Sequence, residues 1–180
     1  SGKVTINVSS DDGEETTTGT TAEIMVGSNA LTSINKNENV KEVELKTDVG
    51  TLTIDKAAWN SMKTVATEGD ETANVVIKLE DKSKEGSNPV YEVTATVGED
   101  NAFDGNGLGS VTISVPFSAA DADTAKVFCI DRGKLEDMHA KVSSDDNKTL
   151  TWSTTHFSSF GVVPYSNSNE PEVFYTQASE

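Results

Sequence analysis

One glycine-rich loop carries three side chains with oxygen atoms that could bind a metal ion. Asp100, Asp104 and Asn106 lie in the loop over residues 98–109. Carboxylate and amide oxygens on a flexible loop are the ligands that calcium prefers. The spacing departs from the EF-hand pattern, because Val111 stands where a bidentate acid is required. Calcium is therefore the one cofactor that these residues suggest, and a solvated turn without metal is the default interpretation.

Other catalytic arrangements lack a residue that their chemistry requires. His139 and His156 are the only histidines and have no cysteine nearby, so a zinc site has little support. No Gly-x-Ser-x-Gly elbow is present for a serine hydrolase. Residues 105–109 (GNGLG) are not followed by the Lys-Ser/Thr pair of a phosphate-binding loop. The sequence therefore predicts a protein that is not an enzyme.

The charge of the chain restricts its partners. Fourteen Lys and Arg stand against thirty Asp and Glu in 180 residues, which gives a formal net charge of −16. A field of this sign repels phosphate backbones and anionic headgroups, so neither nucleic acid nor a membrane surface is an expected partner. No apolar run approaches the roughly 18 residues of a membrane-spanning helix, so we expect no membrane insertion by this chain.

Cysteine use bears on the compartment. Cys129 is the only cysteine, so neither an intrachain disulfide nor a thiolate metal cluster can form. It lies in the apolar run 127–130 and is predicted to be a small buried side chain. Scarce cysteine with abundant Thr, Ser, Asn and Asp is typical of extracellular proteins of Gram-positive bacteria. We therefore expect a secreted or cell-surface location.

Many short segments alternate apolar with polar residues, which is the period of half-buried strands. The segments are 4–8, 22–26, 43–45, 52–54, 75–79, 91–97, 111–115 and 150–152. The run 127–130 is continuously apolar and predicts a strand buried on both faces. Residues 157–163 predict the closing strand.

Residues 56–66 differ, because Ala58, Trp59, Met62 and Val65 recur at helical spacing after Asp55, a candidate N-cap. Short strands with one short helix predict an all-β fold, an antiparallel sandwich of immunoglobulin-like type, since such strands bury their apolar faces only against a second sheet.

The domain organisation follows from the same pattern. We expect a core sandwich over residues 40–163 and a C-terminal tail over residues 164–180. Residues 1–39 supply N-terminal strands and a loop of the same domain.

Two apolar segments near the chain ends are candidates for pairing at a sheet edge: Val4, Ile6 and Val8, and Val173, Phe174 and Tyr175. Docking of the second segment on its own domain is the preferred interpretation, because terminal strands are often tied into their own sheet. Pairing with the edge of a neighbouring molecule is the alternative.

Five short motifs follow one another between residues 40 and 163. They are 55–58 (DKAA), 89–91 (PVY), 111–117 (VTISVPF), 127–135 (VFCIDRGKL) and 154–162 (TTHFSSFGV). In this order they resemble a module that recurs in cell-surface and secreted proteins of Firmicutes and related Gram-positive bacteria. The ending resembles the ZU5-like β-sandwiches. The resemblance implies a non-catalytic structural, adhesion or spacer module that contacts other modules of its parent protein or neighbouring copies.

The resemblance also implies a second hypothesis, since some ZU5-like domains cleave their own backbone at a His-Phe-Ser motif. Here the Ser158 hydroxyl would attack the Phe157 carbonyl while His156 accepts the proton. Phe157 and Phe160 have opposite parity, so one strand holding both is either covered on both faces or bulged between them. A bulge would distort the bond. A closing strand with two core phenylalanines explains the same residues and is preferred.

Carbohydrate binding is the third hypothesis. It needs exposed aromatic rings on a rigid sheet. Trp59 and Trp152 occupy positions where the pattern predicts core, and Tyr165 and Tyr175 are the candidates for exposure.

Overall fold

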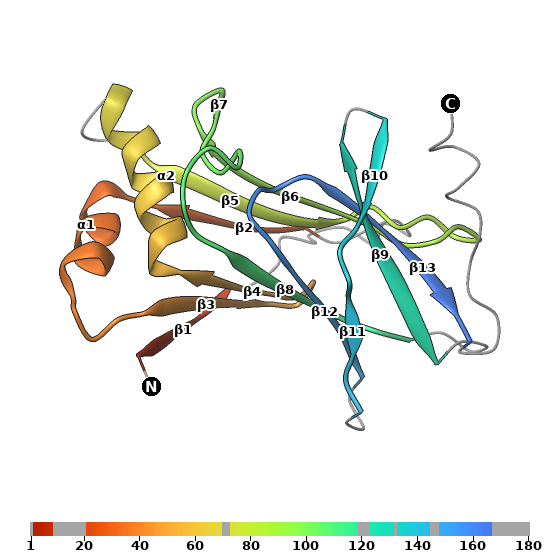
Figure 1. The fold of residues 1–180 in the computed structure, drawn as a ribbon. Coiled ribbons are helices and arrows are strands. Elements are labelled where there is room, and N and C mark those ends of the chain that lie inside the picture. The colour runs from red at the N-terminus through yellow and green to blue at the C-terminus, as the bar shows by residue number, and fades with distance from the viewer. Residues whose placement is uncertain are drawn as a thin grey trace.

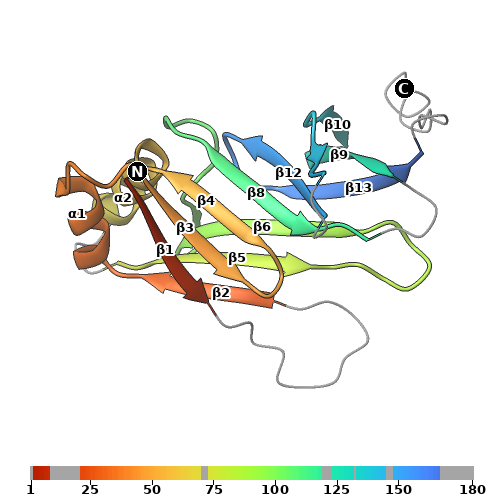
Figure 2. The same ribbon diagram turned by 90° about the horizontal axis from the view of Figure 1, so that it is seen from below.

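Two β-sheets stack face to face, which confirms the predicted all-β sandwich (Figure 1; Figure 2). The computed structural model describes residues 2–8, 21–69, 73–118, 123–131, 133–144 and 148–166. Most strands bury every second side chain, because a pleated strand directs successive side chains to opposite faces.

Sheet A has six strands in the order β1-β3-β4-β8-β12-β11. Their bounds are β1 Lys3–Val8, β3 Glu42–Thr47, β4 Thr51–Asp55, β8 Val111–Pro116, β11 Lys141–Val142 and β12 Thr149–Thr154. Neighbours are antiparallel except β1 and β3, which run parallel. β3 and β4, which contain the predicted segments 43–45 and 52–54, form a hairpin.

Sheet B has seven strands, six of them in the order β10-β9-β13-β6-β5-β2, and β7 pairs with β6. Their bounds are β2 Thr21–Val26, β5 Val75–Asp81, β6 Val90–Val97, β7 Asp100–Asn101, β9 Thr124–Asp131, β10 Lys134–Asp137 and β13 Ser159–Tyr165. β9 was predicted to be buried on both faces. That holds for Val127, Phe128 and Cys129 but is wrong for Ile130, which is 40% exposed.

Two helices pack together at one end of the sandwich (Figure 1). α2, Lys56–Gly69, is the predicted helix, and Asp55 caps it by accepting a hydrogen bond from the Ala58 amide at 2.8 Å. Trp59 and Met62 are buried in the core cluster, where α2 contacts β4 of sheet A and β5 and β6 of sheet B. Neither helix of the described residues is long and apolar enough to cross a membrane.

α1, Ser28–Lys36, was not predicted, so the expectation of one helix was wrong. Its serine, threonine and asparagine residues are weak helix formers and obscure the helical period. Burial of Leu31 and contact with α2 stabilise it instead.

A continuous cluster of buried apolar side chains fills the space between the sheets, from Ala22 on β2 to Val162 on β13. Within this cluster the Trp152 ring centroid lies 6.5 Å from that of Tyr91 and 5.5 Å from that of Phe160. The core is formed by the strands from β2 to β13 together with α1 and α2.

The described chain begins and ends at opposite poles of the sandwich. β1 starts beside α1 and α2, whereas β13 ends at the pole farthest from the helices (Figure 1; Figure 2).

Candidate functional site

The His-Phe-Ser segment lies at the corner where the chain passes from sheet A to sheet B. β12 ends at Thr154 and β13 begins at Ser159, so residues 155–158 form the connection. Phe157 and Phe160 are both buried. The closing strand expected over residues 157–163 is present as β13, but it begins at Ser159, so Phe157 lies before it and a single strand covered on both faces or bulged between the two phenylalanines was wrong. Phe157 and Phe160 can both be buried because the chain passes from sheet A to sheet B between β12 and β13, so the two side chains do not have to share one regular strand.

Hydrogen bonds hold the shape of this corner. The Thr154 hydroxyl donates to the His156 carbonyl at 2.6 Å and accepts from the His156 amide at 3.3 Å. The Phe157 amide donates to the Phe103 carbonyl at 3.1 Å, and the two rings meet with centroids 4.9 Å apart. The 98–109 loop therefore packs directly on the corner.

Both reactive side chains of the corner contact β9. The Ser158 hydroxyl donates to the Ile130 carbonyl at 3.0 Å, and His156 Nε2 lies 3.5 Å from Cys129 Sγ. Burial raises the pKa of the Cys129 thiol, and a hydrogen bond with Ser158 offsets part of this rise. No hydrogen bond joins His156 to Ser158 in the described part of the chain, although general-base activation of the hydroxyl requires one. These side chains anchor the corner to β9.

The structure brings two of the three candidate calcium ligands, Asp104 and Asn106, into direct contact with each other. Both carboxylate oxygens of Asp104 accept hydrogen bonds from Asn106, one from its amide N–H and one from Nδ2, each at 2.9 Å. Asp100 lies on β7, opposite Val97 of β6. Over the residues described, no group of three or more His, Cys, Asp or Glu side chains is placed to hold a metal ion. Calcium binding stays a prediction for a loop whose observed contacts are structural.

β1 forms an edge of sheet A. It pairs only with β3, with Val4 opposite Val43 and Ile6 opposite Leu45. Val43 and Leu45 are buried, yet Val4 and Ile6 on the same face remain 41% and 37% exposed. β1 is therefore less buried than the predicted half-buried strand, because β2, the edge strand of sheet B, covers it only in part.

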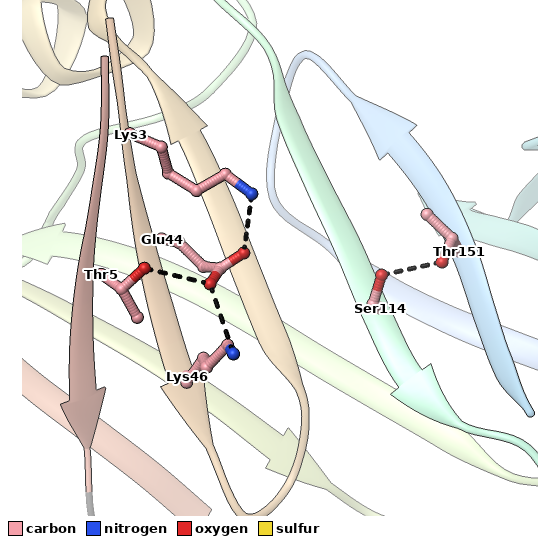
Figure 3. A network of polar contacts seen from close by, with 6 residues as sticks. All are labelled: Lys3, Thr5, Glu44, Lys46, Ser114 and Thr151. Atoms are coloured by element: carbon pink, nitrogen blue, oxygen red, sulfur yellow. Dashed lines mark hydrogen bonds and ion pairs between the residues drawn. The ribbon is translucent and has the colours of Figure 1, made fainter. Parts of the chain in front are cut away.

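One carboxylate on the outer face of sheet A gathers the polar contacts of β1 (Figure 3). Glu44 accepts hydrogen bonds from Lys3 Nζ at 3.2 Å and from the Thr5 hydroxyl at 3.3 Å. Lys46 Nζ lies 3.8 Å from the same carboxylate. The Glu44 side chain is only 13% exposed, so β1 and its neighbours cover it.

Between β1 and β2 the core ends in a narrow cavity of about 10 Å³. Apolar side chains form most of its lining: Val8, Ala22, Ile24, Leu45, Leu52, Ile77 and Leu79. A space of this size holds no more than about one water molecule. This edge of the sandwich is thus closed by apolar contacts.

A wider hollow of about 650 Å³ lies beside β11 and β12. It combines apolar with polar side chains: Met138, Val142 and Trp152, and His139, Lys141, Ser143, Ser144, Thr151 and Ser153. The indole N–H of Trp152 has no hydrogen-bond partner among the described residues. His139, with φ at 54°, lies where the chain turns from β10 of sheet B to β11 of sheet A.

The predicted aromatic and tail residues lie in different places. Trp59 is buried on α2, Trp152 is buried but lines the β11–β12 hollow, and Tyr165 is half-buried on β13. The segment 173–175, which includes Tyr175, lies outside the described residues.

Comparison of the chain with protein-family models gave no match, and comparison with curated proteins gave no significant similarity. The function must therefore be argued from the geometry of the chain itself.

Sequence reasoning did not single out Glu44 or the lining of the β11–β12 hollow. Glu44 alternates with Val43 and Leu45, which signals an outward-facing position. The parallel pairing that brings Lys3 and Thr5 to it has no local sequence signal. The hollow depends on a change of sheet between β10 and β11, which no local pattern predicts.

Proposed function

We propose that this protein is a non-catalytic structural or adhesion module of a bacterial cell-surface or secreted protein, and that it contacts neighbouring copies through β1. The observation that carries the proposal is the edge position of β1 with Val4 and Ile6 partly exposed. An edge strand of this kind is a template for pairing with another chain.

The positions of the two chain ends support the spacer part of the proposal. Segments that leave a sandwich at opposite poles are joined in series rather than side by side, which suits a module that holds other modules apart. The acidic charge and the single cysteine fit an extracellular location. The motif resemblance points to the same setting.

Sedimentation velocity over low micromolar to millimolar concentrations tests the association. Wild-type protein should form a concentration-dependent dimer, and Ile6→Lys should weaken it. Ile130→Lys is the matched control, because Ile130 is 40% exposed on β9, on the other side of sheet B from β2. Since each copy carries a net charge of −16, association should strengthen with salt, as the Debye length falls to about 3 Å at 1 M. A monomer at every concentration and salt overturns this part of the proposal.

A second candidate function is saccharide binding in the β11–β12 hollow. Its volume falls in the usual range for small-molecule sites, roughly 300–1,000 Å³. Apolar side chains beside hydroxyls and an amine suit a sugar ring, which presents apolar C–H faces and hydroxyl groups together.

Saturation-transfer NMR with a panel of mono- and oligosaccharides tests this candidate. Binding should fall in Lys141→Ala and Thr151→Ala, and Lys78→Ala on sheet B is the control. Absence of saturation transfer at millimolar sugar rejects it.

We do not propose self-cleavage at the Phe157–Ser158 bond. Ser158 donates to Ile130, and His156 contacts Cys129, so the contacts favour a structural role. Intact-mass measurement after long incubation at neutral pH should show the full chain. Fragments that disappear in Ser158→Ala would contradict this conclusion.

A further inference from the structure

β1 has few attachments besides its backbone ladder to β3. Its six residues pair with one strand only, and the side-chain hydrogen bonds of Lys3 and Thr5 both end on Glu44 (Figure 3). Exposed ion pairs of this kind contribute little to stability. The Glu44 carboxylate is therefore the main side-chain contact that holds β1 on β3.

The core closes largely without β1. The continuous cluster of buried side chains begins with β2, and Val8 is the only β1 residue that packs against it. Leu45 of β3 meets Leu52, Ile77 and Leu79 around the small cavity behind β1. Departure of β1 would uncover one edge of β3 and leave the rest of the core in place.

Twelve residues, 9–20, separate β1 from β2 in the sequence. Residues 9–20 contain no apolar side chain, so the composition provides no anchor for the core. An extended chain of this length reaches about 40 Å, which is sufficient to carry β1 to a second molecule.

We propose that β1 is an exchangeable strand, which leaves its own β3 and pairs with β3 of a second copy of this chain. The edge of β3 fits β1 in particular, because the parallel register sets Val4 on Val43 and Ile6 on Leu45 and brings Lys3 to Glu44. Reciprocal exchange recreates these contacts between two copies, as in domain swapping. The proposal rests on the proposed association through β1 and specifies its mechanism.

Singly substituted chains can report the exchange. Asn7 and Lys46 are Cα partners on the exposed outer face of β1 and β3. Replacing them removes the Lys46–Glu44 ion pair but keeps the contacts of Lys3 and Thr5 with Glu44. Asn7→Cys chains are mixed with Lys46→Cys chains, both in a Cys129→Ala background, equilibrated at high concentration and oxidised. A disulfide between residues 7 and 46 then requires β1 of one copy to lie on β3 of the other. Its yield is measured by non-reducing electrophoresis and peptide mass.

The matched control uses Thr53→Cys chains mixed with Thr112→Cys chains. These residues are Cα partners on β4 and β8, within the same outer face but inside the sheet. The 7–46 product should exceed the 53–112 product clearly. Adding Glu44→Gln to the Lys46→Cys chain should leave the equilibrated 7–46 yield unchanged, because the exchanged form recreates the Glu44 contacts, but should speed the approach to that yield about two- to fivefold, as expected for the loss of an ion pair that holds β1 in place.

Each outcome decides the matter. A 7–46 product no more abundant than the 53–112 product overturns the exchange. Dominant disulfides between two Asn7→Cys chains show that β1 edges meet side by side, which overturns the exchange and keeps the proposed association. A monomeric chain without either product rejects both.

Discussion

The carboxylate of Asp55 joins two elements that are distant in sequence, and its removal should cost more than the loss of a helix cap. One oxygen accepts the Ala58 amide of α2 at 2.8 Å, and the other accepts the Ser110 amide at 3.0 Å, just before β8. We predict that Asp55→Ala destabilises the fold strongly, whereas Asp55→Asn, which keeps one acceptor, loses about half as much.

The magnitude follows from the two hydrogen bonds. Loss of an N-cap costs about 0.5–2 kcal/mol. Leaving the part-buried Ser110 amide without its acceptor costs about 1–3 kcal/mol more. The free energy of unfolding of Asp55→Ala should therefore fall by roughly 2–4 kcal/mol. For a chain of this length the melting temperature should drop by roughly 4–16 °C.

Urea unfolding followed by tryptophan fluorescence measures the change, since Trp59 and Trp152 are both buried. Glu85→Ala is the matched control, because it removes one carboxylate from an exposed position and should change stability by less than about 0.5 kcal/mol. The reasoning is refuted if Asp55→Ala resembles Glu85→Ala. It is also refuted if Asp55→Asn costs as much as Asp55→Ala.

Three further results are expected. Burial, with Asp81 nearby, raises the pKa of Tyr91 to about 12, so ultraviolet titration should show this phenol ionising at a higher pH than a free tyrosine. Its contribution to the free energy of unfolding is complete below pH 10 and is lost as pH rises through about 12. The Cys129 thiol, buried and with a raised pKa, should react with a disulfide reagent far more slowly in native protein than in urea, and equal rates would contradict its burial. Gly109→Ala should lower the free energy of unfolding by roughly 2–5 kcal/mol in urea titration, because Gly109 has φ at 111° and an added Cβ would collide with the Ala58 backbone; a change under about 1 kcal/mol would contradict the close approach.

Local patterns predicted the elements whose burial is regular. Alternation located β3, β4, β5, β6 and β8, and the spacing of Trp59 and Met62 located α2, because each side chain there meets the core once per period. α1 was not predicted, because its stability comes from the burial of Leu31 and from contact with α2, and such tertiary contacts leave only a weak local signal in the sequence.

The candidate site depended on contacts that local patterns do not encode. The opposed parity of Phe157 and Phe160 showed correctly that a regular strand exposed on one face cannot bury both. The change of sheet that resolves it also turns Ser158 and His156 toward β9, where they meet Ile130 and Cys129. Such pairings join segments far apart in the chain, so they follow from topology rather than from local periodicity.

The opposite placement of the two chain ends determines how a pulling force would enter the sandwich. Tension applied at Gly2 would load β1 lengthwise from its first residue, and tension at Tyr165 would load β13, which is paired on both sides along part of its length. We expect β1 to slide off β3 first, because it has one partner strand and no fully buried side chain. The core from β2 to β13 would stay closed at that point. Under load the module would therefore release one edge strand before its core unfolds.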